Sequence, residues 1–543
     1  MERASRKIVS QYGDKRLIRL ALALLIAAAA AWGANKKILG LFHDDGIYAV
    51  VAKSLAEGNG YRIISLPGAP PQTRYPFVYS YLLSWVWSFD GNFPHNILLL
   101  KSLNIAFLVA LFFAGSAFYQ RACADTSIGD IVFALILCTN PILFTLSDYV
   151  LSDLLAVLFT VIALILFVAG AKFAVFRHTW LPLALVSGFA CLTRLAAVPL
   201  VVGGVAQSVF LRRFREGTLF VCTTLLVTAP WFLWVALAAA PPSGSLFEYY
   251  STYNFTGTRE ATASWSLSRH WTVIVGNVRH LLGTLDLIFL SPLVPGFSAV
   301  VMLLLGVGMI TSIRKEQIAL WCFFLSTLAL VLVWPFHPNR YMAPLVPLLL
   351  LFFFTGVKAL QSRICRVSLM GRWAVITSWL AAAPILILII LNGVWLSSYL
   401  LIHDEQTTRS VYGSRVPYSW KGFEESFAWI RQNTPDDSVL GTAYDPMYFL
   451  YTGRKAIRPA LHRPATYFYP YGAAQPDVGD VDEIKSQMES LRVEYLIIDP
   501  LDSFAEGKAT LALFDQIVLS YGAKATLVFR STDGKHRIYA LAN

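Results

Sequence analysis

The chain has 543 residues, of which 56% are hydrophobic and 14% are charged, which excludes an ordinary water-soluble protein because its surface would lack polar cover. Its formal net charge of +11 is explained by basic residues facing anionic lipid, and no nucleic-acid partner is expected. The six cysteines lie in or beside apolar stretches, so neither a disulfide framework nor a zinc site is expected.

Apolar runs long enough to cross a bilayer recur along the first 400 residues. They begin at 17–33, 97–118, 128–146 and 150–169 and continue to about residue 396, which predicts about eleven transmembrane helices. The first run follows several basic residues and lacks a small-x-small cleavage site, so we interpret it as a retained signal anchor. The stretch 180–211 is too long for one span and predicts two short spans with a break near Arg194 or Pro199.

Basic loops predict the orientation of these spans, because cytoplasmic loops are enriched in lysine and arginine. We expect the N-terminus to be cytoplasmic, and loops 35–95 and 240–286 to lie on the extracytoplasmic side. The expected location is the inner (plasma) membrane, with membrane lipids around a multi-pass protein. The basic residues placed in the cytoplasm are Arg121, Lys172, Arg177, Arg212, Arg213, Arg215, Arg314, Lys315, Lys358, Arg363, Arg366 and Arg372.

The composition changes near residue 400 and divides the chain into two parts. Residues 1–400 form the membrane module, and residues 401–543 predict a soluble extracytoplasmic domain of α/β or α+β type. Helices are expected at 423–433 and 484–491, and strands at 438–443, 494–498 and 537–541.

Two adjacent carboxylates, Asp44 and Asp45, open an amphipathic helix predicted over 44–57 in the first external loop. Tyr48 lies one turn after Asp44 on the same face. One interpretation is that Asp44 only caps the helix and Asp45 is only a solvated acid of its first turn. The other is that one carboxylate takes a proton from an acceptor hydroxyl while the other orients it or holds a cation. The spacing does not assign these roles.

A second acidic pair, Asp148 and Asp153, is predicted at the external end of the fourth span. Five residues separate the two, which is about 140° around a helix, so only one is expected to face a common site. Acids at a membrane edge are costly unless they are paired or used. The alternative for each is a helix cap.

Basic side chains on the same membrane face could hold a phosphate. The candidates are Arg74, Arg194 and Arg340, with Tyr341 beside the last and His337 just before it. Each arginine could instead extend to lipid headgroups, and lone interfacial histidines are more often polar anchors than ligands. Their origin in different spans favours a phosphate pocket.

Four short motifs resemble the GT-C superfamily of membrane glycosyltransferases, and in particular bacterial members of the protein O-mannosyltransferase and lipid A aminoarabinose-transferase group (family 39). The matching segments are 44–48 (DDGIY), 74–79 (RYPFVY), 147–153 (SDYVLSD) and 340–347 (RYMAPLVP). The resemblance implies a GT-C fold and inverting transfer from a polyprenyl-phosphate sugar. It assigns the base to Asp44 and donor phosphate contacts to Arg74, Arg340 and Tyr341.

The chain departs from the family at two positions. Asp45 replaces a glutamate that is common there, and Tyr75 replaces a proline after Arg74. Some relatives use a divalent cation (Mg²⁺, Mn²⁺ or Ca²⁺), and no ligand cluster in this sequence decides whether one is needed.

The expected function is therefore transfer of a sugar from a polyprenyl-phosphate donor to a hydroxyl of a lipid, glycan or protein acceptor. The expected site residues are Asp44, Asp45 and Asp153 for catalysis, Arg74, Arg194, Arg340 and Tyr341 for the donor phosphate, and Tyr48, Asp148 and His337 for substrate. A flippase or transporter of lipid-linked sugars and a non-catalytic envelope assembly protein are the alternatives, although no paired halves of the transporter type are visible.

Overall fold

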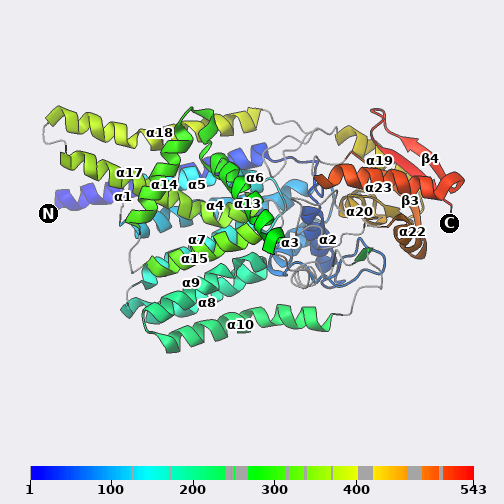
Figure 1. Cartoon of the computed structure of the whole chain (residues 1–543), viewed down its shortest axis with the longest axis horizontal. Helices are drawn as coiled ribbons and strands as arrows, with labels where there is room; N and C mark the ends of the chain where they lie inside the picture. The colour runs from blue at the N-terminus through cyan, green and yellow to red at the C-terminus, as the bar shows by residue number, and fades with distance from the viewer. Residues whose placement is uncertain are drawn as a thin grey trace.

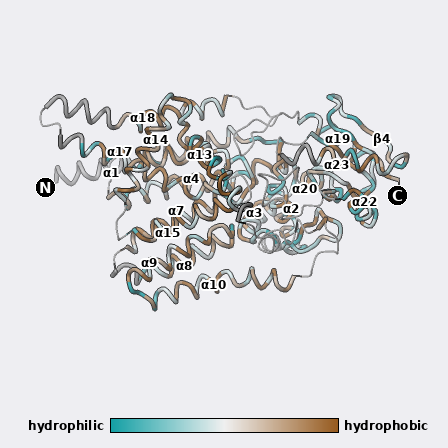
Figure 2. Tube along the Cα trace, in the orientation of Figure 1, coloured by the Kyte–Doolittle hydropathy of each residue, from teal (hydrophilic) through white to brown (hydrophobic). Residues whose placement is uncertain are grey.

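The computed structural model describes residues 2–124, 128–171, 173–238, 246–247, 250, 267–312, 317–334, 339–367, 371–401, 420–460, 480–500 and 505–542. Long helices run side by side along the longest axis of the molecule, with the N-terminus at one end and a small sheet domain at the other (Figure 1). The helical part is coloured mainly as hydrophobic, and hydrophilic segments are frequent in the sheet domain (Figure 2). The described residues therefore form a polytopic helical membrane protein with a C-terminal domain, as predicted.

Seven helices in the described part of the chain are long and apolar enough to cross a membrane, and five shorter apolar helices accompany them. The long ones are α1 (Glu2–Gly33), α4 (Ile97–Cys123), α7 (Asp153–Gly170), α10 (Phe214–Leu237), α13 (Leu267–Phe289), α16 and α17 taken together (Asn339–Met342 and Val346–Val367) and α18 (Gly371–Leu401). The short ones are α5 (Gly129–Cys138), α8 (Phe173–Thr193), α9 (Pro199–Phe210), α14 (Phe297–Thr311) and α15 (Ile318–Val333).

Two regions matter when these helices are compared with the predicted eleven spans: the break between α8 and α9, and helix α13. The break expected near Arg194 or Pro199 is confirmed, because α8 ends at Thr193, Arg194 is extended, and α9 begins at Pro199. Helix α13 was not predicted and occupies the end of the stretch assigned to the external loop 240–286. Its polar residues, such as Asn277 and Asp286, make it the least apolar of the seven long helices. For this reason its hydropathy did not predict a span.

The first loop, between α1 and α4, carries two helices, α2 (Asp44–Ala56) and α3 (Val78–Phe89), which lie between the membrane helices and the C-terminal domain (Figure 1). The predicted amphipathic helix α2 has one face formed by Ile47, Val50, Val51 and Ser54, and these side chains are buried. This helix packs against both α3 and the C-terminal domain, so more than one face is covered. The first loop is therefore part of the core that joins the two parts of the chain.

The C-terminal domain contains a mixed five-stranded sheet in the order β2-β1-β3-β5-β4. Strands β1, β2 and β3 are parallel, whereas β5 pairs antiparallel with β3 and β4. The strands are β1 (Val439–Gly441), β2 (Lys455–Ile457), β3 (Val493–Ile498), β4 (Ala525–Arg530) and β5 (Arg537–Leu541), and the helices are α19 (Trp420–Asn433), α20 (Asp445–Thr452), α22 (Val481–Ser490) and α23 (Ala505–Tyr521).

The three strands and two helices predicted for this domain are confirmed within a few residues. Strand β5 has the predicted bounds, β1 lies within the predicted 438–443, and β3 begins one residue before the predicted 494–498. The sequence missed β2 and β4, the two edge strands, and the helices α20 and α23. Strand β2 has only three residues, and β4 is mostly exposed, so neither carries the apolar alternation of a buried strand.

Candidate functional site

The adjacent acids Asp44 and Asp45 have different partners at the start of α2. The Asp45 carboxylate accepts hydrogen bonds from the backbone N–H of Gly40 (3.0 Å) and Gly46 (2.9 Å), so it closes the loop before the helix. The Asp44 carboxylate accepts the hydroxyl of Tyr75 at 2.6 Å and Nη1 of Arg340 at 3.1 Å. The helix N-cap is His43, without a side-chain cap, so Asp44 does not serve as a simple helix cap.

Asp153 lies in the first turn of α7 and faces two guanidinium groups. Arg194 approaches Oδ1 at 2.6 Å, and Arg340 approaches Oδ2 at 2.8 Å through Nη2. Arg340 also donates from Nε to Oδ1 at 3.4 Å. Because the same guanidinium reaches Asp44, Arg340 joins the start of α2 to α7.

Local backbone breaks place both arginines at this point. Arg194 has an extended backbone between α8 and the short helix that precedes α9. Arg340 lies on the single helical turn α16. The Arg340 guanidinium stacks over the ring of Phe42 at 4.6 Å, and that of Arg194 over Tyr341 at 5.4 Å. A buried guanidinium is costly unless it is paired, and these ion pairs and ring contacts meet that requirement.

Positive charge dominates the surroundings of Asp44. Burial alone would raise its pKa, but the charges of Arg340 and Arg74 and the Tyr75 hydrogen bond together lower it to about 2. Asp44 is therefore ionised throughout the physiological pH range. Two carboxylates and three guanidinium groups leave this cluster with an excess of positive charge, which suits an anionic ligand.

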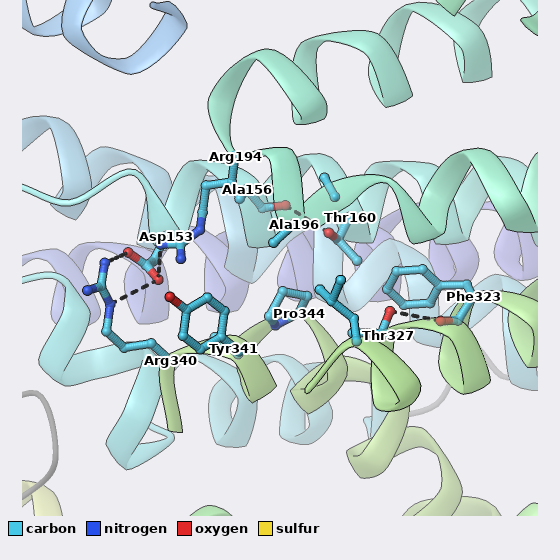
Figure 3. A pocket seen from close by; sticks show the side chains of 13 residues that line it. Asp153, Ala156, Thr160, Arg194, Ala196, Phe323, Thr327, Arg340, Tyr341 and Pro344 are labelled. Atoms are coloured by element: carbon cyan, nitrogen blue, oxygen red, sulfur yellow. Dashed lines mark hydrogen bonds and ion pairs between the residues drawn. The ribbon is translucent and has the colours of Figure 1, made fainter. Parts of the chain in front are cut away.

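A pocket opens beside Asp153, Arg194, Arg340 and Tyr341. Figure 3 shows the four charged or polar side chains at one end and smaller or apolar side chains toward the other. The second end is lined by Ala156, Thr160, Ala196, Ala197, Phe323, Thr327, Leu330, Ala343 and Pro344. The hydroxyls of Thr160 and Thr327 donate to carbonyls of their own helices, which makes this end less polar.

The other predicted site residues lie at different distances from this cluster. Tyr48 is buried, and its hydroxyl forms a 2.9 Å hydrogen bond with Oγ of Ser152, the residue directly before Asp153. Arg74 is half-buried over the ring of Tyr75, and its charge reaches Asp44. His337 lies outside the described residues.

Asp148 does not join the arginine cluster. Its Oδ1 accepts hydrogen bonds from Lys101 Nζ at 2.9 Å and from the backbone N–H of Asn35 at 2.7 Å. The expectation that only one of Asp148 and Asp153 faces a common site agrees with this arrangement, since Asp153 alone lines the pocket. Substrate binding by Asp148 and a catalytic role for Asp45 stay predictions.

The acidic residues do not form an evident cage for a divalent cation. Within the described part of the chain, no three His, Cys, Asp or Glu side chains gather closely enough to hold a metal ion. Asp44 and Asp153, the carboxylates of the cluster, are both engaged by guanidinium groups. Among the described residues, these carboxylates are thus already paired with positive charges of the protein.

Sequence reasoning missed several contributors to this site. Tyr75, noted in the sequence as a departure from the family pattern, donates to Asp44, and the Arg340 guanidinium stacks on Phe42. Lys101, within an apolar run, holds Asp148. The one available signal was Lys101, since a lysine inside a transmembrane helix requires a partner.

Comparison with known proteins gives a match in structure but not in sequence. No protein-family model matches the chain, and no curated protein sequence matches it significantly. The crystal structure of ArnT from Cupriavidus metallidurans in the apo state superimposes with a TM-score of 0.57 at 12% identity, covering 98% of both chains. The same protein bound to undecaprenyl phosphate gives 0.53 at 13% identity, covering 97% of this chain and 98% of that one.

A second protein shows the same likeness. The Archaeoglobus fulgidus oligosaccharyltransferase tethered to an acceptor peptide gives a TM-score of 0.58 at 11% identity, over 97% of this chain and 74% of that one. ArnT and this oligosaccharyltransferase are GT-C glycosyltransferases. The likeness at this identity is one of fold, and it extends over nearly the whole chain. The chain is therefore a membrane protein with the GT-C fold, as its sequence motifs predicted.

Proposed function

We propose that the chain is a glycosyltransferase that moves a sugar from a polyprenyl-phosphate donor to an acceptor hydroxyl, with inversion and with Asp44 as the general base. The observation that carries the proposal is the position of Arg340, which bridges Asp44 and Asp153 at the polar end of a pocket whose other end is largely apolar. A lipid phosphate has the same division between an anionic head and an apolar chain.

The arginines are the proposed donor site. The phosphate would lie against Arg340 and Arg194 with Tyr341 beside it, and the isoprenoid chain would follow Ala156, Thr160 and Phe323. Arg74 would contribute further positive charge from the loop. The complex of the neighbouring ArnT with undecaprenyl phosphate supports this donor class.

Asp44 is the proposed base because its carboxylate lies next to Arg340 and remains partly exposed. The acceptor hydroxyl oxygen forms a bond to the anomeric carbon while its proton passes to Asp44. The bond from that carbon to the phosphate oxygen breaks, and the phosphate leaves with the electron pair. Arg340 and Arg194 stabilise the developing charge, which is the largest contribution expected from such a site.

Release of Arg340 is needed for Asp44 to act. A carboxylate with a pKa of about 2 is a weak base at neutral pH. Donor phosphate that pairs with Arg340 draws the nearest positive charge away from Asp44, and the pKa of Asp44 then rises. Donor binding would thereby strengthen the base in the complex in which it is used.

The proposed setting is the bacterial inner membrane, with a cytoplasmic N-terminus and the site on the extracytoplasmic face. The basic loops of the sequence support this orientation. The acceptor would be a lipid, glycan or protein hydroxyl reached from that side.

The test is a transfer assay with purified full-length protein in lipid nanodiscs, a panel of polyprenyl-phosphate sugars and hydroxyl acceptors of each class. We expect transfer with at least one donor and acceptor pair, with inverted configuration at the anomeric carbon. Vectorial movement of the donor without transfer would support a transporter instead, and absence of both would support a non-catalytic role. Product with retained configuration would refute the single-displacement mechanism.

A further inference from the structure

Helix α20 of the C-terminal domain contacts the loop that carries Asp44. Nε2 of His43, the residue directly before Asp44, donates to Oδ1 of Asp445 at 3.0 Å. The two side chains are 10% and 0% exposed. The second oxygen of Asp445 has no hydrogen-bond partner among the described residues, so the bond to His43 is the side-chain hydrogen bond that this buried carboxylate makes among them.

The loop is pressed closely against α20 on both sides of His43. A Cβ added at Gly46 would lie 2.9 Å from side-chain atoms of Pro446, and one at Gly40 would lie 2.8 Å from Cβ of Met447. Tyr451, at the far end of α20, donates its hydroxyl to the carbonyl of Lys37. The contact surface leaves no room for the loop to shift toward the domain.

The backbone at His43 needs such support. Its φ of 67° and ψ of −59° lie in a strained region that non-glycine residues rarely adopt. Such a conformation persists only where the surroundings hold it. The His43 ring, fixed by Asp445, supplies one such restraint.

A change at His43 would pass directly to Asp44. The His43 carbonyl accepts the first helical hydrogen bond of α2 from Ile47 N–H at 3.0 Å, and the Asp44 N–H donates to Phe42 at 2.9 Å. Rotation at His43 would therefore turn the Asp44 side chain away from Tyr75 and Arg340.

We propose that Asp445 is a positioning residue for Asp44 and acts through His43, which makes the C-terminal domain a working part of the transfer site. This inference rests on the proposed function for its kinetic consequence, although the restraint on the loop stands on the contacts alone. A positioning role predicts a change in kcat, whereas acceptor binding by the domain would alter KM for the acceptor.

The experiment compares full-length Asp445→Leu, His43→Ala and the double variant in nanodiscs with the best polyprenyl-phosphate sugar of the panel. We expect each single variant to lower kcat roughly 10- to 100-fold, because small misplacements of a reacting group cost this much. KM for donor and acceptor should stay within about twofold. The double variant should lose no more than either single one, since both remove the same contact.

Two further variants separate positioning from a general loss of structure. Asp445→Asn keeps an oxygen that can accept from His43 and should recover most of kcat. Asp515→Asn, which alters an exposed ion pair with Arg537 in the same domain, should behave as wild type. Wild-type kcat in Asp445→Leu, additive losses in the double variant, or a loss confined to KM would each overturn the proposal.

Hydrogen exchange decides the question even if no donor is turned over. We expect faster exchange of amides 40–48 in Asp445→Leu than in wild type, and no change in Asp515→Asn. Unchanged exchange in Asp445→Leu would overturn the positioning role. Failure of the wild type to transfer any sugar would overturn the proposed function, while the exchange result would stand independently.

Discussion

Replacement of Asp44 by asparagine tests the proposed base while it preserves the shape of the side chain. An amide cannot accept the proton of the acceptor hydroxyl, and general base catalysis contributes about 10²- to 10⁴-fold. We expect kcat to fall by this factor. The Tyr75 hydrogen bond can be kept by the amide oxygen, and Arg340 keeps Asp153 as its partner.

The stability cost of the same substitution follows from the pKa of Asp44. Its value of about 2, below the ordinary 3.8, corresponds to about 2 kcal/mol of stabilisation by the ionised form. Because the folded-state pKa is lowered, this contribution is present above pH 3.8 and is lost as the pH falls through about 2. At neutral pH, Asp44→Asn should therefore lose up to about 2 kcal/mol and remain folded.

The assay pairs initial rates of sugar transfer with thermal unfolding in the same nanodiscs. Asp90→Asn makes the same chemical change after α3 and serves as the control, with wild-type rates expected. Full activity in Asp44→Asn would refute the base assignment. Loss of activity together with loss of the folded transition would not count as support, and Asp44→Glu would then distinguish a missing base from a missing fold.

Three further results are expected. The fall of kcat at low pH should occur at a higher pH than the fall of kcat/KM. The reason is that donor phosphate pairs with Arg340 and raises the pKa of Asp44 only in the complex. If both parameters fell at the same pH in a pH series, this effect of the donor would be contradicted. Lys101→Met should lower stability by about 3–5 kcal/mol in thermal unfolding, since it leaves the buried Asp148 carboxylate unpaired, and an unchanged melting temperature would argue against that pair. Ala156→Trp should fill the pocket and weaken undecaprenyl phosphate binding at least tenfold in a titration, and wild-type affinity would place the lipid elsewhere.

The class of the protein and most of its elements were accessible from the sequence because their signals are local. A span needs about 20 apolar residues in succession, and the break at Arg194 is visible as a span that is too long. Helix α13 shows the limit of this signal, since its polar side chains are satisfied by distant partners, such as Asn277 by the carbonyls of Val331, Leu332 and Trp334.

The candidate site could be assembled from the sequence only as a group of residues on one membrane face. Topology brought Asp44, Asp153 and Arg340 to the same side, and the structure brings them into contact. The division of labour between Asp44 and Asp45 could not be predicted, because both are adjacent acids at the start of one helix. Their difference depends on where each carboxylate points after the loop has folded around Gly40.

The sequence by itself determined that this chain is a polytopic membrane protein with a C-terminal domain of different composition, because hydropathy and charge act over short stretches of chain. Only the tertiary structure decided which charges pair. Arg340 meets Asp44 across 296 positions, and Asp445 meets His43 across 402. Contacts at such separations depend on how the helices pack and how the C-terminal domain lies on the first loop, and neither leaves a periodic pattern in the sequence.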